Sequence, residues 1–384
     1  RLTASSDLRS AINSSDISII AVGTPFDGDI IDLKYIRQVS KEIGECLSLQ
    51  NNYHVVIVKS TVVPGTTDKV VKPILEKYSK KISGKDFGIG MNPEFLREGV
   101  AVEDFMKPDR IVLGGSDDIT HKIMTELYKP FGEIDTLTTN NKTAEMIKYT
   151  ANSLLATLIS FSNEIGNLSS TIGNIDTKEV MRGVHLDKRI SPVLENGRRI
   201  TPGITSYLEA GCGFGGSCFP KDVDALISHG NSVNNPMDLL KSVMQINKAQ
   251  PLQVVNRVLK HYPDMNGLRI AVLGLAFKPG TDDMRESPAI LIINKIIELG
   301  SVVSAYDPIA EAEARKLFID KEIFYYDSLE DSVRESDVLL LLTSWPEFEK
   351  IPNLLKSLNI NPLVVDGRRM LSKSKILNYE GIGI

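Results

Sequence analysis

The feature that most constrains the fold of this chain is a series of continuous apolar runs, each followed by a turn and an amphipathic segment. Residues 17–22 (Ile-Ser-Ile-Ile-Ala-Val) form one run and end at Gly23-Thr24-Pro25, and residues 53–58 form another. Between them, residues 32–49 carry apolar side chains at helical spacing. Strands that are apolar throughout belong to parallel sheets covered by helices. We therefore expect a doubly wound α/β sheet at the start of the chain.

The rest of the chain divides into a helical middle and a second α/β unit. From about residue 142 the pattern is helical for nearly thirty residues, and helical segments continue around 176–184, 220–229 and 236–261. Residues 267–274 then open a new strand, and strand and helix patterns alternate to the end. A chain of 384 residues is too long for one core. We predict two Rossmann-like doubly wound domains, residues 1–140 and 263–384, joined by a helical central domain, residues 141–262, with one long helix.

Composition excludes several classes of function. The net charge of −5, from 44 basic and 49 acidic residues, gives no footprint for nucleic acid or an anionic membrane. No apolar run reaches the roughly 18 residues of a membrane helix. Three cysteines form no disulfide framework and suit a reducing compartment, so we expect a cytoplasmic protein. The five histidines lack ligand spacing, and no metal site is expected.

A cysteine motif concentrates reactive side chains in residues 213–222 (Gly-Phe-Gly-Gly-Ser-Cys-Phe-Pro-Lys-Asp). Pro220 suits the first turn of a helix, which places Cys218 at the positive N-terminal end of that helix. This position favours the thiolate, the nucleophilic form of cysteine. Asp222 is expected one turn beyond, where a carboxylate can hold a water or a proton. The alternative is a glycine-rich turn around a structural cysteine.

Three further blocks accompany this motif in a fixed order. They are residues 92–99 (Asn-Pro-Glu-Phe-Leu-Arg-Glu-Gly), residues 144–152 (Ala-Glu-Met-Ile-Lys-Tyr-Thr-Ala-Asn) and residues 277–288 (Phe-Lys-Pro-Gly-Thr-Asp-Asp-Met-Arg-Glu-Ser-Pro). In this order and spacing the four blocks closely resemble the UDP-glucose/GDP-mannose dehydrogenase family over essentially the whole chain. The tail Ser-Cys-Phe-Pro-Lys-Asp is more similar to the UDP-glucose and GDP-mannose branches than to the N-acetylhexosamine branch.

The resemblance implies NAD-dependent oxidation of a nucleotide sugar from the C6 alcohol to the carboxylate in two hydride transfers. Cys218 matches the family nucleophile, which captures the aldehyde as a thiohemiacetal and becomes a thioester. Lys148 and Asn152, spaced i and i+4 on the long helix, would stabilise an oxyanion and orient water. The remaining predicted catalytic residues are the carboxylates Asp222, Glu98 and Glu94 and the hydroxyl of Thr61. The competing interpretations are a solvated helix face for the first pair and surface acids for the glutamates.

The resemblance also implies binding roles. The residues expected to bind the cofactor NAD are Thr24, Thr61, Glu98, Lys221 and Arg285. The residues expected to bind the UDP-sugar substrate are Phe95, Leu96, Lys148, Asn152, Tyr207, Gly215, Phe277, Lys278, Arg368 and Arg189. Arg369 is an alternative to Arg368, and Arg189 resembles an arginine supplied across a dimer interface. The long central helix is expected to form a homodimer.

The chain departs from the family pattern at its start, and several alternative functions stay open. Family members begin with a strand, a GxGxxG turn for pyrophosphate and an acid for the ribose, none of which occurs here. We therefore expect a chain whose first part is absent and which as written binds NAD poorly. The expected substrate is UDP-glucose, with GDP-mannose or another UDP-hexose as the alternative. More remote alternatives are a two-electron hydroxyacid-type dehydrogenase and a non-catalytic binder of sugar nucleotides.

Overall fold

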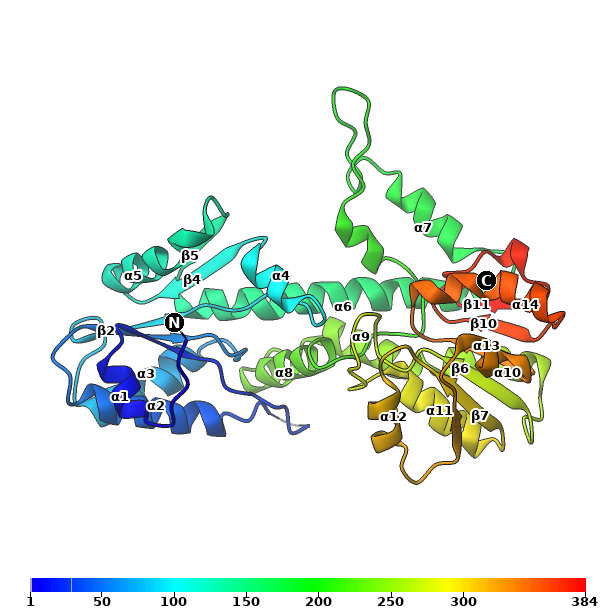
Figure 1. The fold of residues 1–384 in the computed structure, drawn as a ribbon. Coiled ribbons are helices and arrows are strands. Elements are labelled where there is room, and N and C mark those ends of the chain that lie inside the picture. Colours follow the sequence, from blue (N-terminus) through cyan, green and yellow to red (C-terminus); the bar gives the residue numbers. More distant parts are fainter. Residues whose placement is uncertain (1, 29) are drawn as a thin grey trace. The chain divides into compact units, whose positions relative to one another are not determined.

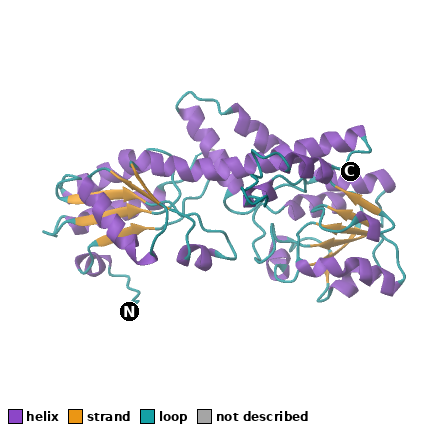
Figure 2. Cartoon of the chain, turned by 90° about the horizontal axis from the view of Figure 1, so that it is seen from above, coloured by secondary structure: helices purple, strands orange, loops and turns teal. Residues whose placement is uncertain are grey.

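The computed structural model describes residues 2–28 and 30–384, which form two compact units. The first unit comprises Arg1–Asn152 and Asp224–Pro236, and the second comprises Ser153–Val223 and Met237–Ile384. Each unit contains one sheet flanked by helices (Figure 1 and Figure 2). Helices α6 (Asn141–Ile172) and α8 (Phe219–Ser232) contribute residues to both units. The division into three domains at residues 140 and 262 stays a prediction.

The sheet of the first unit has the strand order β1-β2-β3-β4-β5. Its strands are β1 (Ile17–Ile20), β2 (His54–Val58), β3 (Phe87–Met91), β4 (Ile111–Gly115) and β5 (Thr136–Thr139). All of β2, β3 and β4 is buried, as continuous apolar runs predict. Neighbouring strands are parallel except β3 and β4, which are antiparallel. The antiparallel pair is a departure from the regular alternation expected of the sequence.

Helices cover this sheet on both faces. They are α1 (Leu8–Asn13), α2 (Lys34–Leu47), the π-helical turn η1 (Thr67–Val71), α3 (Lys72–Ser79), α4 (Ala101–Met106), α5 (Asp118–Tyr128) and the 3₁₀ turn η2 (Lys129–Phe131). The apolar side of α2 packs into the core through Ile36, Ile43 and Leu47, which confirms the helix predicted over 32–49. A Cβ at Gly44 would lie 2.9 Å from the Cβ of Tyr78, so this glycine lets α2 approach α3 closely.

The sheet of the second unit is fully parallel, with the order β11-β10-β9-β6-β7-β8. Its strands are β6 (Arg269–Leu273), β7 (Val302–Tyr306), β8 (Ile323–Tyr325), β9 (Val338–Leu341), β10 (Leu363–Asp366) and β11 (Tyr379–Gly381). The chain starts at central β6, adds two strands on one side and then three on the other. This is the doubly wound order, in which ligands bind past the carboxyl ends of β6 and β9. The predicted second Rossmann-like sheet is confirmed.

The helices of the second unit follow the sequence pattern closely. Besides the shared helices they are α7 (Thr177–His185), η3 (Gly203–Tyr207), α9 (Asp238–Ala249), α10 (Leu252–His261), α11 (Pro288–Glu298), α12 (Glu311–Leu317), α13 (Leu329–Arg334), η4 (Pro346–Lys350), α14 (Ile351–Leu358) and η5 (Lys373–Lys375). The Ser287 hydroxyl caps α11 by accepting from Ala289 N, as predicted. The helical stretch expected over 236–261 is two helices, because Pro251 has no N–H to continue α9.

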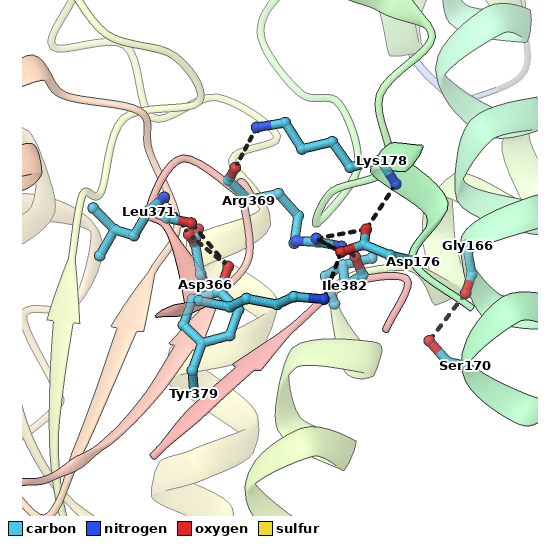
Figure 3. Close-up of polar contacts among 10 residues, drawn as sticks. Gly166, Ser170, Asp176, Lys178, Asp366, Arg369, Leu371, Tyr379 and Ile382 are labelled. Atoms are coloured by element: carbon cyan, nitrogen blue, oxygen red, sulfur yellow. Dashed lines mark hydrogen bonds and ion pairs between the residues drawn. The ribbon is translucent and has the colours of Figure 1, made fainter. Parts of the chain in front are cut away.

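Helix α7 is tied to the C-terminal end of the chain by an ion-pair cluster (Figure 3). The Asp176 carboxylate accepts from Lys178 N at the start of α7 and from Arg369 Nη2 at 2.7 and 2.9 Å. The Lys178 ammonium donates to the Arg369 carbonyl at 3.2 Å, and Lys373 Nζ reaches Asp176 at 3.1 Å. Arg369 is buried, and its guanidinium donates to the Asp176 carboxylate and to the Ile382 carbonyl.

Candidate active site

Two threonines meet at the carboxyl edge of the first sheet. Thr24 follows β1, Thr61 follows β2, and the Thr24 hydroxyl donates to the Thr61 carbonyl at 2.7 Å. The Ser60 hydroxyl donates to the Val22 carbonyl at 2.7 Å and joins the same two loops a second time. The structure thus brings both predicted cofactor-binding threonines together at the edge where ligands of such sheets bind.

The predicted lysine lies on helix α6 against the segment that follows β3. Lys148 is 4% exposed, and its ammonium is 2.9 Å from the Glu94 carboxylate. Its Nζ also lies 5.7 Å from the centre of the Phe95 ring, whose face is covered by the Arg110 guanidinium at 3.9 Å. A buried ammonium is tolerated when it is paired in this way. Glu94, Phe95 and Lys148 therefore form one charged cluster in the first unit.

Other members of the predicted set lie beside this cluster along the chain. Asn152 is one turn after Lys148 on α6, and side chains spaced i and i+4 share a helix face. Leu96 donates its backbone N–H to the Glu94 carboxylate at 2.6 Å. Residues 92–97 are not helical and α4 begins only at Ala101, so Glu94 and Glu98 do not share a helix face.

The cysteine motif in the second unit ends in the start of helix α8. Cys218 directly precedes the first helical residue, Phe219, and is exposed. The hydroxyl of Ser217 lies 3.6 Å from its sulfur. Asp222 is 1% exposed, donates its backbone N–H to the Cys218 carbonyl at 2.8 Å and pairs with Lys221 Nζ at 2.6 Å. The expected helical turn between Cys218 and Asp222 is confirmed.

The two other cysteines are packed inside. Cys46 and Cys212 are 7% and 0% exposed, and burial raises the pKa of each thiol. The Cys212 thiol donates to the Leu342 carbonyl at 3.6 Å. Exposure therefore separates Cys218 from both of them.

Glycines of the motif allow close contact with the loop after β6. A Cβ at Gly215 would lie 2.0 Å from the Glu286 carbonyl oxygen, and one at Gly216 would lie 2.7 Å from the Phe277 ring. Gly216 also donates its N–H to the Arg285 carbonyl at 2.8 Å. Any side chain at these two positions would push the loops apart. Gly215, Phe277 and Arg285, all predicted to bind ligands, are thereby brought together.

Arg368 connects the same loops to the second sheet. Its guanidinium donates to the carbonyls of Leu342 at 2.6 Å, Gly213 at 3.2 Å and Phe277 at 3.4 Å. Leu342 directly follows β9, so Arg368 lies at the carboxyl edge beside the point where the strand order reverses. Arg369, by contrast, is engaged with Asp176.

The remaining predicted residues lie as follows. Lys278 Nζ is 5.5 Å from the Phe277 ring centre, and the Tyr207 ring is 6.4 Å from that of Phe219. Arg189 is exposed and pairs with its neighbour Asp187 at 2.5 Å. It lies at the base of an arm that leads from α7 to η3 and is closed by a bridge between Val193 and Arg199. This arm projects from the second unit in Figure 1.

Sequence reasoning missed one carboxylate in the first unit. Glu145 is 0% exposed and accepts from Gly65 N at 2.5 Å and from Thr67 N at 2.8 Å. Burial raises the pKa of this carboxyl to about 7, against the lowering effect of the two N–H groups. Glu145 thus joins helix α6, one turn before Lys148, to the loop after Thr61. Its place inside the block 144–152 is the only sequence signal.

In the described part of the chain, no group of three or more His, Cys, Asp or Glu side chains could hold a metal ion. Among the same residues, no helix is long and apolar enough to cross a membrane.

Three segments of the chain match the UDP-glucose/GDP-mannose dehydrogenase family. Residues 1–132 match its NAD binding domain, residues 142–249 its central domain and residues 271–373 its UDP binding domain. The chain therefore belongs to this family of NAD-dependent dehydrogenases.

Individual relatives agree with the family assignment. The chain is 38% identical to UDP-glucose 6-dehydrogenase AglM of Haloferax volcanii, over 100% of this chain and 86% of the relative. It is 42% identical to UDP-glucose 6-dehydrogenase TuaD of Bacillus subtilis, over 97% and 76% respectively. Among solved structures, a UDP-glucose dehydrogenase from Pyrobaculum islandicum superposes with a TM-score of 0.86 at 34% identity, covering 99% of this chain and 82% of that one. A UDP-D-ManNAc dehydrogenase from Pyrococcus horikoshii superposes with a TM-score of 0.79 at 27% sequence identity. This match covers 98% of this chain and 83% of that one.

Proposed function

We propose that this protein oxidises UDP-glucose to UDP-glucuronate in two successive hydride transfers. The observation that carries the proposal is the exposed Cys218 at the start of α8, followed one turn later by the buried carboxylate of Asp222. A dehydrogenase that stops at the aldehyde needs no such nucleophile. The relatives named UDP-glucose 6-dehydrogenase, at 38% and 42% identity, support the choice of sugar nucleotide.

The overall reaction converts one primary alcohol, one water and two NAD⁺ into a carboxylate, two NADH and three protons. NAD supplies the hydride acceptor. The Cys218 sulfur adds to the C6 aldehyde and forms a thiohemiacetal, whose oxidation leaves a thioester on the same sulfur. Water then attacks the thioester carbonyl, the C–S bond breaks and the thiol is released. Asp222, which pairs with Lys221 at 2.6 Å, is proposed to accept the proton of that water.

Residues of the first unit are proposed to stabilise charge that develops on the C6 oxygen. Lys148 is a fixed ammonium and Asn152 an amide one turn along the same helix. Preorganised donors of this kind act without reorganising when the oxyanion forms. Glu94 holds the lysine in place, and Glu98 is proposed to assist water activation. Thr24 and Thr61, joined by their hydrogen bond at the carboxyl edge of the sheet, suit the nicotinamide side of NAD.

Residues of the second unit are proposed to bind the nucleotide. Phe277 offers a ring face to the uracil, and Lys278 and Arg368 offer cations to the phosphates. Gly215 and Tyr207 complete this set. Phe95 and Leu96 are proposed to contact the sugar, Lys221 and Arg285 the cofactor, and Arg189 the nucleotide of a second subunit.

We further propose that the protein is a homodimer formed around helix α6. Besides Met146 near its start, four large apolar side chains on this helix are substantially exposed: Leu154 50%, Phe161 48%, Leu168 54% and Ile172 63%. Their spacing of 7, 7 and 4 residues places them on one helix face. A row of this length is characteristic of a surface that a partner covers. A second copy of the chain is the occupant that we infer.

A panel of nucleotide sugars tests the proposed activity. The full-length protein should give two NADH per molecule of UDP-glucose, and UDP-glucuronate as the product. Preferential turnover of GDP-mannose or of another UDP-hexose would keep the mechanism and change the substrate. One NADH per sugar would indicate a two-electron dehydrogenase, and binding measured by calorimetry without NADH would indicate a non-catalytic protein.

A further inference from the structure

A second lysine of the first unit lies beside the Glu94–Lys148 pair, and no role has been assigned to it. Lys59 directly follows β2 and is partly buried, and its ammonium donates to Asn92 Oδ1 at 2.8 Å. Asn92 directly follows the neighbouring strand β3 and stands two residues before Glu94. The ring centre of Tyr128, on α5, lies 6.0 Å from the same ammonium. Lys59 thus connects the carboxyl ends of two adjacent strands.

Asn92 is held by four hydrogen bonds. Its side-chain oxygen accepts from Lys59 and from the Tyr128 hydroxyl, and its side-chain nitrogen donates to the Val112 carbonyl at 2.9 Å. Its backbone N–H donates to the Val58 carbonyl at 2.9 Å. The backbone that leads through Pro93 to Glu94 therefore starts from a fixed residue.

The charges around Lys59 are those of the proposed catalytic cluster. Burial lowers the pKa of the Lys59 ammonium, the Glu94 carboxylate on the loop after β3 raises it, and Lys148 on α6 lowers it again. From α5, Tyr128 faces it as a neutral phenol whose pKa is raised by burial. Glu94 therefore interacts with two ammonium groups, of which only Lys148 touches it at ion-pair distance.

A purely structural role does not account for a charge at position 59. Removing an ammonium from water costs free energy, and burial lowers the pKa of the Lys59 ammonium. Asn92 Oδ1 would keep the Tyr128 hydroxyl as a partner if Lys59 were apolar. A neutral side chain could fill this place without leaving an unsatisfied acceptor. The charge itself is therefore what needs an explanation.

We propose that Lys59 is a positioning residue for the oxidation: through Asn92 and through its charge it holds the Glu94 carboxylate against Lys148. This inference rests on the proposed function. Lys59 acts on Glu94, Glu94 orients the Lys148 ammonium, and Lys148 meets the C6 oxygen. A small displacement of such a hydrogen-bond donor strongly lowers the reaction rate, because the donor is effective only when it is already in position.

The test compares Lys59→Met and Lys59→Arg with Lys85→Met, which removes the same charge from an exposed lysine of the same unit. For Lys59→Met we expect kcat to fall by about tenfold to a hundredfold, with KM for UDP-glucose and NAD changed less than about threefold. Lys59→Arg should recover part of kcat, and Lys85→Met should behave as wild type.

Thermal unfolding separates positioning from structure. The Tm of Lys59→Met should equal or exceed that of wild type, since a partly buried charge has been removed. A kcat within twofold of wild type, or a loss of kcat accompanied by a matching loss of Tm, would overturn the proposal for Lys59. Failure of the wild-type protein to give two NADH per UDP-glucose would instead overturn the proposed function. The NADH yield of the wild-type protein is therefore measured before that of any variant.

Discussion

The buried carboxyl of Glu145 gives a stability prediction whose size follows from the structure. The group is 0% exposed and accepts two backbone N–H groups at the start of η1. Its pKa is raised from 4.5 to about 7 because burial outweighs these hydrogen bonds. The change to test is Glu145→Gln, which keeps the shape and stays neutral at every pH.

The sign follows from the direction of the shift. The pKa is higher in the folded state, so the protonated carboxyl contributes stability that is fully present below about pH 4.5 and is lost as the pH rises through about 7. A shift of about 2.5 units corresponds to about 3 kcal/mol in total, of which about 2.5 kcal/mol falls between pH 5 and pH 8. The glutamine variant has no such loss. Its free energy of unfolding relative to wild type should therefore rise by about 2.5 kcal/mol across this range.

Urea unfolding of wild type and Glu145→Gln at pH 5, 6, 7 and 8 measures this difference. The side-chain NH₂ group of glutamine would face one of the two backbone N–H groups, which are also donors. This lowers the free energy of unfolding by about 1–3 kcal/mol at every pH and leaves its dependence on pH unchanged. Glu133→Gln, at an exposed position of the same unit, is the control and should run parallel to wild type. Parallel curves for Glu145→Gln and wild type would refute the assignment of a raised pKa to this carboxyl.

Three further experiments with substituted proteins have expected outcomes. Cys218→Ser should reduce UDP-glucuronate formation by roughly a thousandfold or more, because the sulfur that carries the acyl group is gone; near-normal NADH production would contradict the mechanism. Arg368→Met should raise KM for UDP-glucose by about tenfold, whereas Arg369→Met should instead cost about 3 kcal/mol of stability by leaving its carboxylate partner short of a cation; the reverse pattern would exchange their roles. Phe161→Glu combined with Leu168→Glu should convert a dimer to monomers in light scattering, and an unchanged mass would exclude α6 as the interface.

The architecture could be predicted because its signals are local. Continuous apolar runs indicate buried strands, and Ser287-Pro288 indicates the start of α11. Local signals do not predict the order of the strands in a sheet. The antiparallel pairing of β3 with β4 depends on contacts between segments that are distant in the sequence. The pattern over 236–261 predicts helix throughout, although Pro251 marks the boundary between α9 and α10.

Residues of the candidate site could be predicted where they belong to a sequence motif. Residues that matter only because the fold brings distant partners to them could not be predicted. Lys148 and Asn152 are spaced for one helix face, and Cys218 precedes a helix that Pro220 signals. Lys59 and Glu145 are not at a characteristic spacing from any other residue of the predicted site. Their importance arises from partners 33 and 80 residues away in the sequence, which only the folded chain brings near.

The measurement that bears most directly on the central claim is the mass of the protein during turnover. Asp222→Asn should slow thioester hydrolysis, so that UDP-glucose and NAD leave a UDP-glucuronyl group on the protein. Intact-mass and peptide analysis should find that group on Cys218 and on no other residue. Formation of two NADH per sugar with no acyl adduct, or with the adduct at another side chain, would contradict covalent catalysis by this cysteine.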